Sequence, residues 1–201
     1  MRGELIIVAL GYLAGSLPTA LLVVRAATGG DVRTSGSGNV GATNAARLAG
    51  LRVGALVTVV DMVKGALPVL VMEWYNPAAV WVGTVLLASV LGHCYPVWLR
   101  FRGGKGVATV FGALVVVSPL TTLAAAGIWV VVLLAFRFVS LASMLAAASF
   151  PVLLVWMGSP AVAMVWMVTA AVVLIVLRHV SNIRNILNGD EIRLGVGEGD
   201  E

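Results

Sequence analysis

Charged residues and cysteine are scarce in this sequence. Only 11% of its 201 residues are Asp, Glu, Lys or Arg, whereas 60% are hydrophobic. A soluble domain typically carries about a quarter charged residues, and one core at this length cannot bury so much apolar surface, so a water-soluble fold is excluded. Cys94 is the single cysteine, which excludes an internal disulfide. The formal net charge of +4 is too small to indicate a nucleic-acid partner.

Long apolar runs take up most of the chain. Because the hydrocarbon core of a bilayer requires about 20 apolar residues per helix, the sequence predicts an all-α, polytopic membrane helical bundle. We expect one domain over residues 1–194 and a flexible Gly- and acid-rich tail over 195–201. The third and fourth segments are short, so five spans is the alternative to about seven transmembrane helices, at residues 5–24, 51–72, 78–91, 107–117, 120–136, 141–157 and 161–177.

The basic residues indicate how the chain is threaded. With the N-terminus outside, eleven of the thirteen Lys and Arg fall on one side, leaving Arg2 opposite and Lys64 inside a span. Cytoplasmic loops collect Lys and Arg, so the sequence predicts an outside N-terminus, a cytoplasmic C-terminus and an odd number of spans. We expect the first apolar run to remain as a span rather than to be removed as a signal peptide.

The first predicted cytoplasmic loop is rich in small polar residues. Three glycines there match G-x-G-x-x-G, but no strand precedes them, and Ala42 stands where a Walker A loop requires lysine. A glycine-rich loop before a helix still lets backbone N–H groups converge on an anion. The alternative is a flexible polar connector. The predicted anion-binding residues are Ser35, Gly36, Ser37, Gly38, Asn39, Gly41, Thr43, Asn44 and Arg47.

The second predicted cytoplasmic loop places a lysine among glycines at the entrance to a helix. Flanking glycines favour close approach of the backbone to a ligand, so this arrangement predicts a phosphate cradle. Arg100 and Arg102, in contrast, are interpreted as ordinary basic anchors of the cytoplasmic side. The cradle residues are Gly103, Gly104, Lys105 and Gly106.

Two further sets of polar residues lie near or inside spans. His179 and Asn182 are three residues apart and are predicted to share a helical face, on the same side as the two glycine-rich loops, which favours a functional role. Asp61 and Lys64 have the same spacing inside a span. Ionisable residues in lipid usually pair, so these two are interpreted as a buried structural ion pair, with direct catalysis as the alternative.

These clusters together resemble the PlsY family of bacterial membrane acyl-phosphate:glycerol-3-phosphate acyltransferases. The matching segments are "GSGNVGATN" with Arg47, "GHCYPVWLRFRGGKGVAT", "VSLAS", and "RHVSNIRNIL" with "GDE". The resemblance implies seven spans and an active site on the cytoplasmic face of the bacterial plasma (inner) membrane. It also implies transfer of a fatty acyl group from acyl phosphate to the 1-hydroxyl of sn-glycerol 3-phosphate. The products are lysophosphatidic acid and phosphate, in the first acylation of phospholipid synthesis.

The resemblance also implies roles for individual residues. It places the substrate phosphates against the first two loops, with Arg47, Lys105, Ser143, His179 and Asn182 as the catalytic set. Glu191 is implied to be structural, like the Asp61–Lys64 pair. The expected partners are acyl phosphate, glycerol 3-phosphate and the lipid bilayer. We expect a monomer with no metal, cofactor or nucleic acid.

This chemistry agrees with the residues present. Phosphate is a good leaving group, so no covalent nucleophile is required, but two anionic substrates repel by roughly 4 kcal/mol at 4 Å and an effective dielectric constant near 20. Cations such as Arg47 and Lys105 would offset that repulsion. His179 is one candidate base, and a phosphate oxygen of the substrate is the slightly preferred one. The alternatives are a transporter for an organic phosphate, for which the opposite side lacks polar residues, and a lipid phosphatase.

Overall fold

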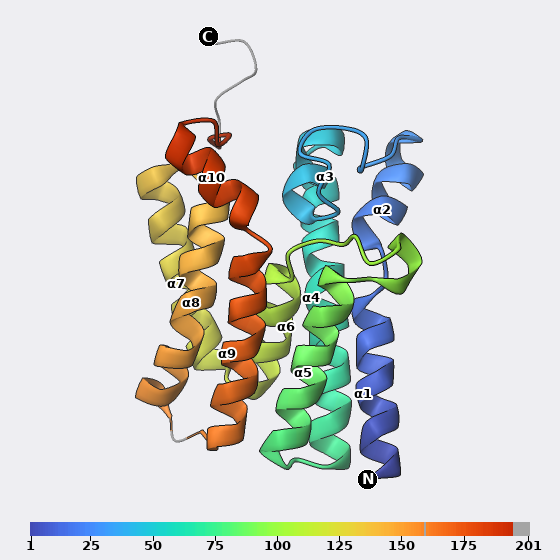
Figure 1. Cartoon of the computed structure of the whole chain (residues 1–201), viewed down its shortest axis with the longest axis vertical. Coiled ribbons are helices and arrows are strands. Elements are labelled where there is room, and N and C mark those ends of the chain that lie inside the picture. Colours follow the sequence, from blue (N-terminus) through green and yellow to red (C-terminus); the bar gives the residue numbers. More distant parts are fainter. Residues whose placement is uncertain (159, 195–201) are drawn as a thin grey trace.

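The structure contains helices joined by loops, and no strands, over residues 1–158 and 160–194, the ranges that the computed structural model describes. The predicted all-α membrane bundle is confirmed (Figure 1). The tail predicted over residues 195–201 lies outside the described residues. The elements are α1 (Arg2–Gly15), α2 (Thr19–Thr28), α3 (Ala42–Ala49), α4 (Leu51–Tyr75), α5 (Ala79–Cys94), η1 (Val97–Leu99), α6 (Val107–Val117), α7 (Pro119–Phe136), α8 (Val139–Met157), α9 (Val162–Leu177) and α10 (Val180–Asn188).

The helices differ in whether they are long enough to cross a bilayer. Among the described residues, five candidate spans pass on length and hydropathy, comprising α1 with α2, α4, α5 with η1, α7 and α8, and the bent pair of α9 and α10 makes a sixth. Helix α6 has 11 residues, about 16 Å at 1.5 Å per residue, which is shorter than the hydrocarbon core. Each of the seven predicted segments therefore corresponds to helix, and the number of complete crossings stays a prediction.

The first predicted span is broken where the sequence places Pro18. Helix α1 ends at Gly15 and α2 begins at Thr19, because proline lacks the N–H group that would continue the helix. The carbonyl of Leu17, freed by this break, accepts a 3.0 Å hydrogen bond from Lys64 Nζ. The same Nζ lies 2.7 Å from Asp61 Oδ1. The predicted ion pair is thus present, and it also joins α4 to the break between α1 and α2.

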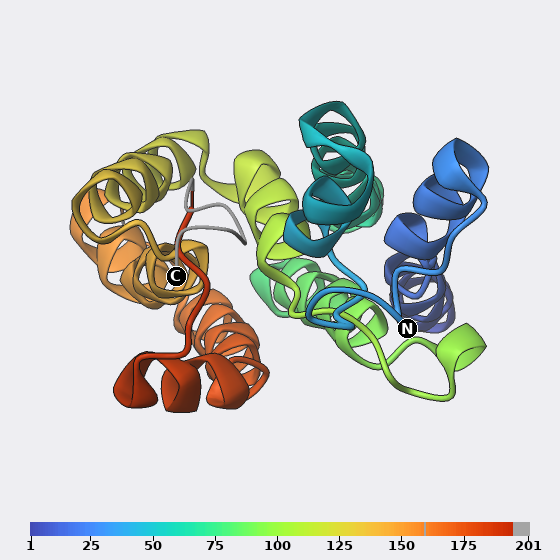
Figure 2. The ribbon, with the colours of Figure 1, turned by 90° about the horizontal axis from the view of Figure 1, so that it is seen from above.

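Helices α4 and α6 pack with their backbones in direct contact. A Cβ atom at Gly65 would lie 2.0 Å from the carbonyl oxygen of Thr109, and one at Gly112 would lie 1.9 Å from that of Met62. Small residues permit this separation in membrane bundles. Seen from above, α7, α8, α9 and α10 lie on one side of α6, and α1 to α4 lie on the other (Figure 2).

One end of the bundle carries the polar loops, and Met1 lies at the opposite end (Figure 1). This polar end comprises residues 29–50, 95–106 and 178–194. The loop of residues 95–106 lies deeper in the bundle than α3 and α10. The two glycine-rich loops and the set that contains His179 and Asn182, called the third cluster below, are therefore brought to the same end of the molecule.

Candidate active site

The first loop is organised by Asn44, which lies in α3 and is 1% exposed. Its Nδ2 donates to the carbonyls of Val32 at 2.8 Å and Ser35 at 3.1 Å, and its Oδ1 accepts from the backbone N–H of Ser37 at 3.1 Å. Gly36 has a φ of +57°, and a Cβ there would lie 2.3 Å from Asn44 Oδ1. Asn44 was predicted to bind substrate, and its amide is instead committed to holding the loop.

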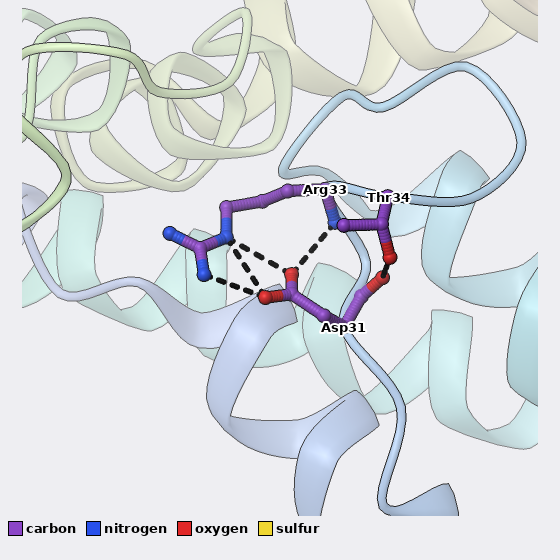
Figure 3. Close-up of polar contacts among 3 residues, drawn as sticks. All are labelled: Asp31, Arg33 and Thr34. Carbon is purple, nitrogen blue, oxygen red and sulfur yellow. Dashed lines mark hydrogen bonds and ion pairs between the residues drawn. The ribbon is translucent and has the colours of Figure 1, made fainter.

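The beginning of the same loop is held by a local ion pair (Figure 3). Arg33 Nε donates to both carboxylate oxygens of Asp31 at 2.9 and 3.1 Å, and Arg33 Nη2 donates to Oδ2 at 2.5 Å. These bonds lower the pKa of Asp31 to about 2. Thr34 adds a hydroxyl bond to the Asp31 carbonyl at 3.1 Å. The charge of Arg33 is therefore largely compensated before any substrate arrives.

The second loop uses its glycine amides for packing. The N–H groups of Gly103 and Gly104 donate to the carbonyls of Cys94 and His93, each at 3.1 Å, which satisfies the end of α5. These two amides are thus not free to bind an anion, as the cradle interpretation had supposed. The groups that remain available to an anion are the Lys105 side chain and the first amides of α6, because a helix leaves its first four N–H groups without intrahelical partners.

The third cluster lies at a bend of 49° between α9 and α10. His179 precedes α10 at this bend, so it and Asn182 do not share one continuous helix as predicted, although both still line the same cavity. His179 is 2% exposed, and its Nδ1 lies 2.8 Å from the carbonyl oxygen of Ile175. A carbonyl only accepts, so Nδ1 carries the proton. Burial, together with the charge of Lys105, lowers the pKa of His179 to about 4, leaving Nε2 as an acceptor.

A chain of hydrogen bonds joins the second loop to the third cluster. Lys105 Nζ donates to Asn182 Oδ1 at 2.5 Å, and Asn182 Nδ2 donates to Glu191 Oε1 at 2.7 Å. Ser140 Oγ donates to the same Glu191 oxygen at 2.5 Å. Asn182 therefore stands between the ammonium and the carboxylate. Burial lowers the pKa of Lys105 to about 8. The negative charge of Glu191 opposes this shift, and the positive charge of Arg47 adds to it.

Two adjoining cavities occupy the polar end. The smaller, of about 460 Å³, is lined by all five residues of the predicted catalytic set, Arg47, Lys105, Ser143, His179 and Asn182. Its wall continues along apolar side chains of three helices, including Met62, Phe111 and Val130. The larger cavity, of about 1160 Å³, shares Arg47, Lys105 and Asn182 and adds further arginines. Polar and cationic groups thus meet apolar walls in one space.

Most of the remaining predicted residues line one or both of the two cavities. Ser37, Asn39, Gly41, Thr43, Asn44 and Gly106 line the smaller one, as does Asp61 beside the ion pair. Gly36, Gly38 and Gly103 line only the larger one. Ser35, Lys64 and Gly104 line neither. Glu191, predicted to be structural, lines both and bonds to the site through Asn182.

Polar residues outside the predicted catalytic set also line the cavity, among them Trp129 and Ser140. Trp129 on α7 donates from Nε1 to Ser143 Oγ at 3.2 Å, and Ser140 orients Glu191. An indole inside an apolar run is an ordinary feature of a membrane helix, so nothing in the pattern distinguished Trp129. Ser140 precedes Ser143 by three residues, but its partner Glu191 is 51 residues away.

The cavity is cationic and polar at one part of its wall and apolar at another. This combination defines an integral membrane protein suited to bind charged and lipidic groups together. Residues 5–189 match the family described as glycerol-3-phosphate acyltransferase. The glycerol-3-phosphate acyltransferase of Geotalea daltonii is 44% identical over 191 residues, covering 95% of this chain and 97% of its own. That of Myxococcus xanthus is 51% identical over 144 residues, covering 71% and 75%. The chain belongs to the glycerol-3-phosphate acyltransferase family.

Two solved structures share the whole architecture. The glycerol 3-phosphate form of PlsY, an integral membrane glycerol 3-phosphate acyltransferase, is 40% identical, covers 96% of both chains and has a TM-score of 0.92. The lysophosphatidic acid form is 39% identical, with the same coverage and a TM-score of 0.90. The PlsY resemblance inferred from the motifs is therefore confirmed.

Proposed function

We propose that this protein transfers a fatty acyl group from acyl phosphate to the 1-hydroxyl of sn-glycerol 3-phosphate, giving 1-acyl-glycerol 3-phosphate (lysophosphatidic acid) and phosphate. The observation that carries the proposal is the convergence of Arg47, Lys105 and His179 on one cavity whose wall becomes apolar at Phe111 and Val130. Family membership gives the acyltransferase class. The apolar wall is suited to the acyl chain, and the cationic part to the two phosphates.

Electrostatics is the main contribution that these residues make. Two phosphate-bearing substrates approach only if cations offset their repulsion, which reaches roughly 4 kcal/mol for unit charges at 4 Å and an effective dielectric constant near 20. Arg47 and Lys105 line both cavities and supply these charges. The first amides of α3 and α6 add fixed dipoles next to them. Holding both reactants in register removes about 7–11 kcal/mol of the barrier in well-oriented systems.

The proton of the attacking hydroxyl has two possible acceptors. With its pKa lowered to about 4, His179 is a weak base near neutral pH, whereas a phosphate monoester has a second pKa near 6. We propose that a phosphate oxygen takes the proton of the 1-hydroxyl, and that His179 Nε2 accepts a hydrogen bond from the neighbouring 2-hydroxyl of glycerol 3-phosphate, which orients the substrate. The new ester C–O bond then forms as the acyl C–O bond to phosphate breaks, and phosphate leaves.

The other members of the set complete this arrangement. Asn182 holds Lys105 Nζ in place, and Glu191 and Ser140 hold Asn182 in turn. Ser143 accepts a hydrogen bond from Trp129, which leaves its own O–H free to donate to a substrate oxygen. Glu191 is therefore assigned a supporting role, in agreement with the role implied by the family resemblance.

We place this site on the cytoplasmic face of the bacterial inner membrane, in a seven-span, monomeric chain with an outside N-terminus and one domain over residues 1–194. Eleven of the thirteen Lys and Arg lie on the side of the polar loops, which supports the cytoplasmic orientation. The position of Met1 at the opposite end of the bundle agrees with an odd number of crossings (Figure 1).

The direct test supplies purified protein with acyl phosphate and radiolabelled glycerol 3-phosphate. Label is expected to become extractable into organic solvent, with one inorganic phosphate released per acyl chain transferred. Acyl-CoA and acyl carrier protein thioesters serve as donor controls and are expected to give no product. Absence of labelled lipid with acyl phosphate would contradict the proposed reaction.

A further inference from the structure

Arg178 connects two parts of the site that lie far apart in the sequence. It follows α9 directly and is half-buried. Its Nη2 donates to the Gly103 carbonyl at 2.8 Å and its Nε donates to the Gly104 carbonyl at 3.1 Å, across 75 and 74 residues of chain. A guanidinium presents its donors in a rigid planar fork, so two successive carbonyls are held by one group.

The guanidinium is anchored on its other face as well. Its carbon lies 5.3 Å from the centroid of the Tyr95 ring, a cation–π distance. The carbonyl of Tyr95 accepts a 2.8 Å hydrogen bond from the Tyr12 hydroxyl of α1. In the described part of the chain, Arg178 forms no ion pair with a carboxylate. Its guanidinium instead donates to backbone carbonyls at the wall of the larger cavity.

The sequence neighbours of these contacts are site residues. Arg178 is followed directly by His179, and Gly104 is followed directly by Lys105. The two bonds therefore fix the separation between the lysine-bearing loop and the junction that carries the histidine. The only other hydrogen bond described between these two segments is the one from Lys105 to Asn182, and a substrate phosphate that attracts Lys105 competes with that bond.

We infer that Arg178 is a positioning residue for the acyl transfer, which sets the register between Lys105 and His179 by bridging the carbonyls of Gly103 and Gly104. This inference rests on the proposed function for its activity readout. Arg178 touches no reacting atom in this scheme. It acts by keeping the loop against the α9–α10 junction when Lys105 turns from Asn182 to a phosphate.

The variants Arg178→Ala and Arg178→Lys separate the effect of the planar set of guanidinium donors from the effect of the positive charge. Lysine keeps the positive charge but donates from one point, so it cannot hold both carbonyls in plane. Arg184→Ala and Arg184→Lys are matched controls, because Arg184 is exposed on α10 and lines neither cavity. The readouts are kcat/KM for acyl transfer, calorimetric binding of inorganic phosphate and glycerol 3-phosphate, and the melting temperature.

We expect kcat/KM to fall about 10–100-fold in both Arg178 variants, the scale on which small misplacements in an active site act, with the Arg184 controls unchanged. Added guanidinium ion should restore part of the activity of Arg178→Ala, and ammonium should not. A further signature is the alkaline limb of the pH profile, which should move to higher pH in Arg178→Ala and stay in place in Arg178→Lys, since only alanine removes a charge that disfavours the protonated lysine.

Wild-type kcat/KM in Arg178→Ala would overturn the inference, as would a loss that guanidinium does not restore and that parallels a lower melting temperature. If the wild-type chain binds phosphate but transfers no acyl group, the proposed function fails. Binding then decides the inference separately, since weaker phosphate binding in Arg178→Ala supports it and unchanged binding overturns it.

Discussion

The two glycine-rich loops at the polar end reach the same cavity by different means. The loop of residues 31–41 is held from within, by Asn44 and by the Asp31–Arg33 pair, with partners no more than twelve residues apart. The loop of residues 95–106 is held by groups outside it, namely the end of α5 and Arg178, which is 74 residues away from Gly104 in the sequence. The first loop is a local motif, and the second depends on tertiary packing.

This difference determines how much of each loop's geometry can be inferred from the residues of the loop alone. A self-contained loop presents its helix N-terminus to an anion wherever the loop is placed, so its glycines and asparagines are informative in isolation. A loop held by distant groups gains its geometry only when the bundle assembles. Changes in the first loop are therefore expected to affect that loop alone, whereas changes in the second are expected to affect the third cluster as well.

The largest effect is expected from Lys105→Met in the second loop. Removing this cation should lower kcat/KM by about 10²–10³-fold, mainly through a higher KM for a phosphate substrate, because an uncompensated like-charge contact is worth roughly 4 kcal/mol at 4 Å and a dielectric constant near 20. Lys105→Arg, which keeps the charge, is the control. An unaltered KM for both substrates in Lys105→Met would refute the role given to this loop.

Asn44→Ala should have the next largest effect, in the first loop. It leaves three backbone groups without their partner, each worth about 1–3 kcal/mol when buried and unsatisfied, so we expect kcat/KM to fall about 10–100-fold and the melting temperature in detergent to fall as well. Asn188→Ala, at an exposed position that ends α10, should change neither. Retention of both properties in Asn44→Ala would show that the loop is held by other contacts.

The pH dependence distinguishes the two loops further. Lys105 has its pKa lowered to about 8, so it loses its proton, and with it the charge that binds phosphate, as the pH rises through that value. KM for a phosphate substrate should then rise by up to about tenfold per pH unit above 8, since kcat/KM reports the free enzyme. In Lys105→Arg this limb should disappear, because arginine stays charged. A flat profile between pH 7 and 9 in the wild type would contradict the assignment.

His179→Gln tests the third cluster and should have a smaller effect. Glutamine keeps hydrogen bonding but cannot transfer a proton, so turnover should stay within about tenfold of wild type if a phosphate oxygen is the base, the low end of general-base contributions being about 10²-fold. Loss of several orders of magnitude in kcat with unchanged substrate binding would instead identify His179 as the base.

Asp31→Asn should have the smallest effect. Arg33 is exposed and Asp31 is half-buried, and ion pairs near the surface contribute little, so we expect less than about a threefold change in kcat/KM. Initial rates at low and high salt provide the measurement, and the variant should differ from wild type least at high salt. A change as large as that of Asn44→Ala would mean that the ion pair, rather than the asparagine, holds the loop.

Much of the site could be predicted because its chemistry is concentrated in short motifs. Arg47, Lys105, His179 and Asn182 stand in short polar motifs, Ser143 was added by the family resemblance, and all five line one cavity. Likewise, the apolar runs predicted the long apolar helices and the short helix at residues 107–117, whereas α3 and α10 lie in segments that were predicted as loops.

The remaining features depend on contacts between distant segments. The bend at Arg178 and His179 has no proline or glycine to mark it, so a continuous helix was the natural expectation. The amides of Gly103 and Gly104 are taken up by the end of α5, a pairing that exists only after the chain turns back at Pro96. The bond from Trp129 to Ser143 joins two helices, and no period within either helix reveals it.

The most direct test of the central claim, that one cavity holds both substrates together, is the initial-rate pattern with acyl phosphate and glycerol 3-phosphate varied against each other. Direct transfer within a ternary complex predicts intersecting double-reciprocal lines and no burst of phosphate release before glycerol 3-phosphate is added. Parallel lines with a stoichiometric burst would indicate a covalent acyl-enzyme, and would contradict the account.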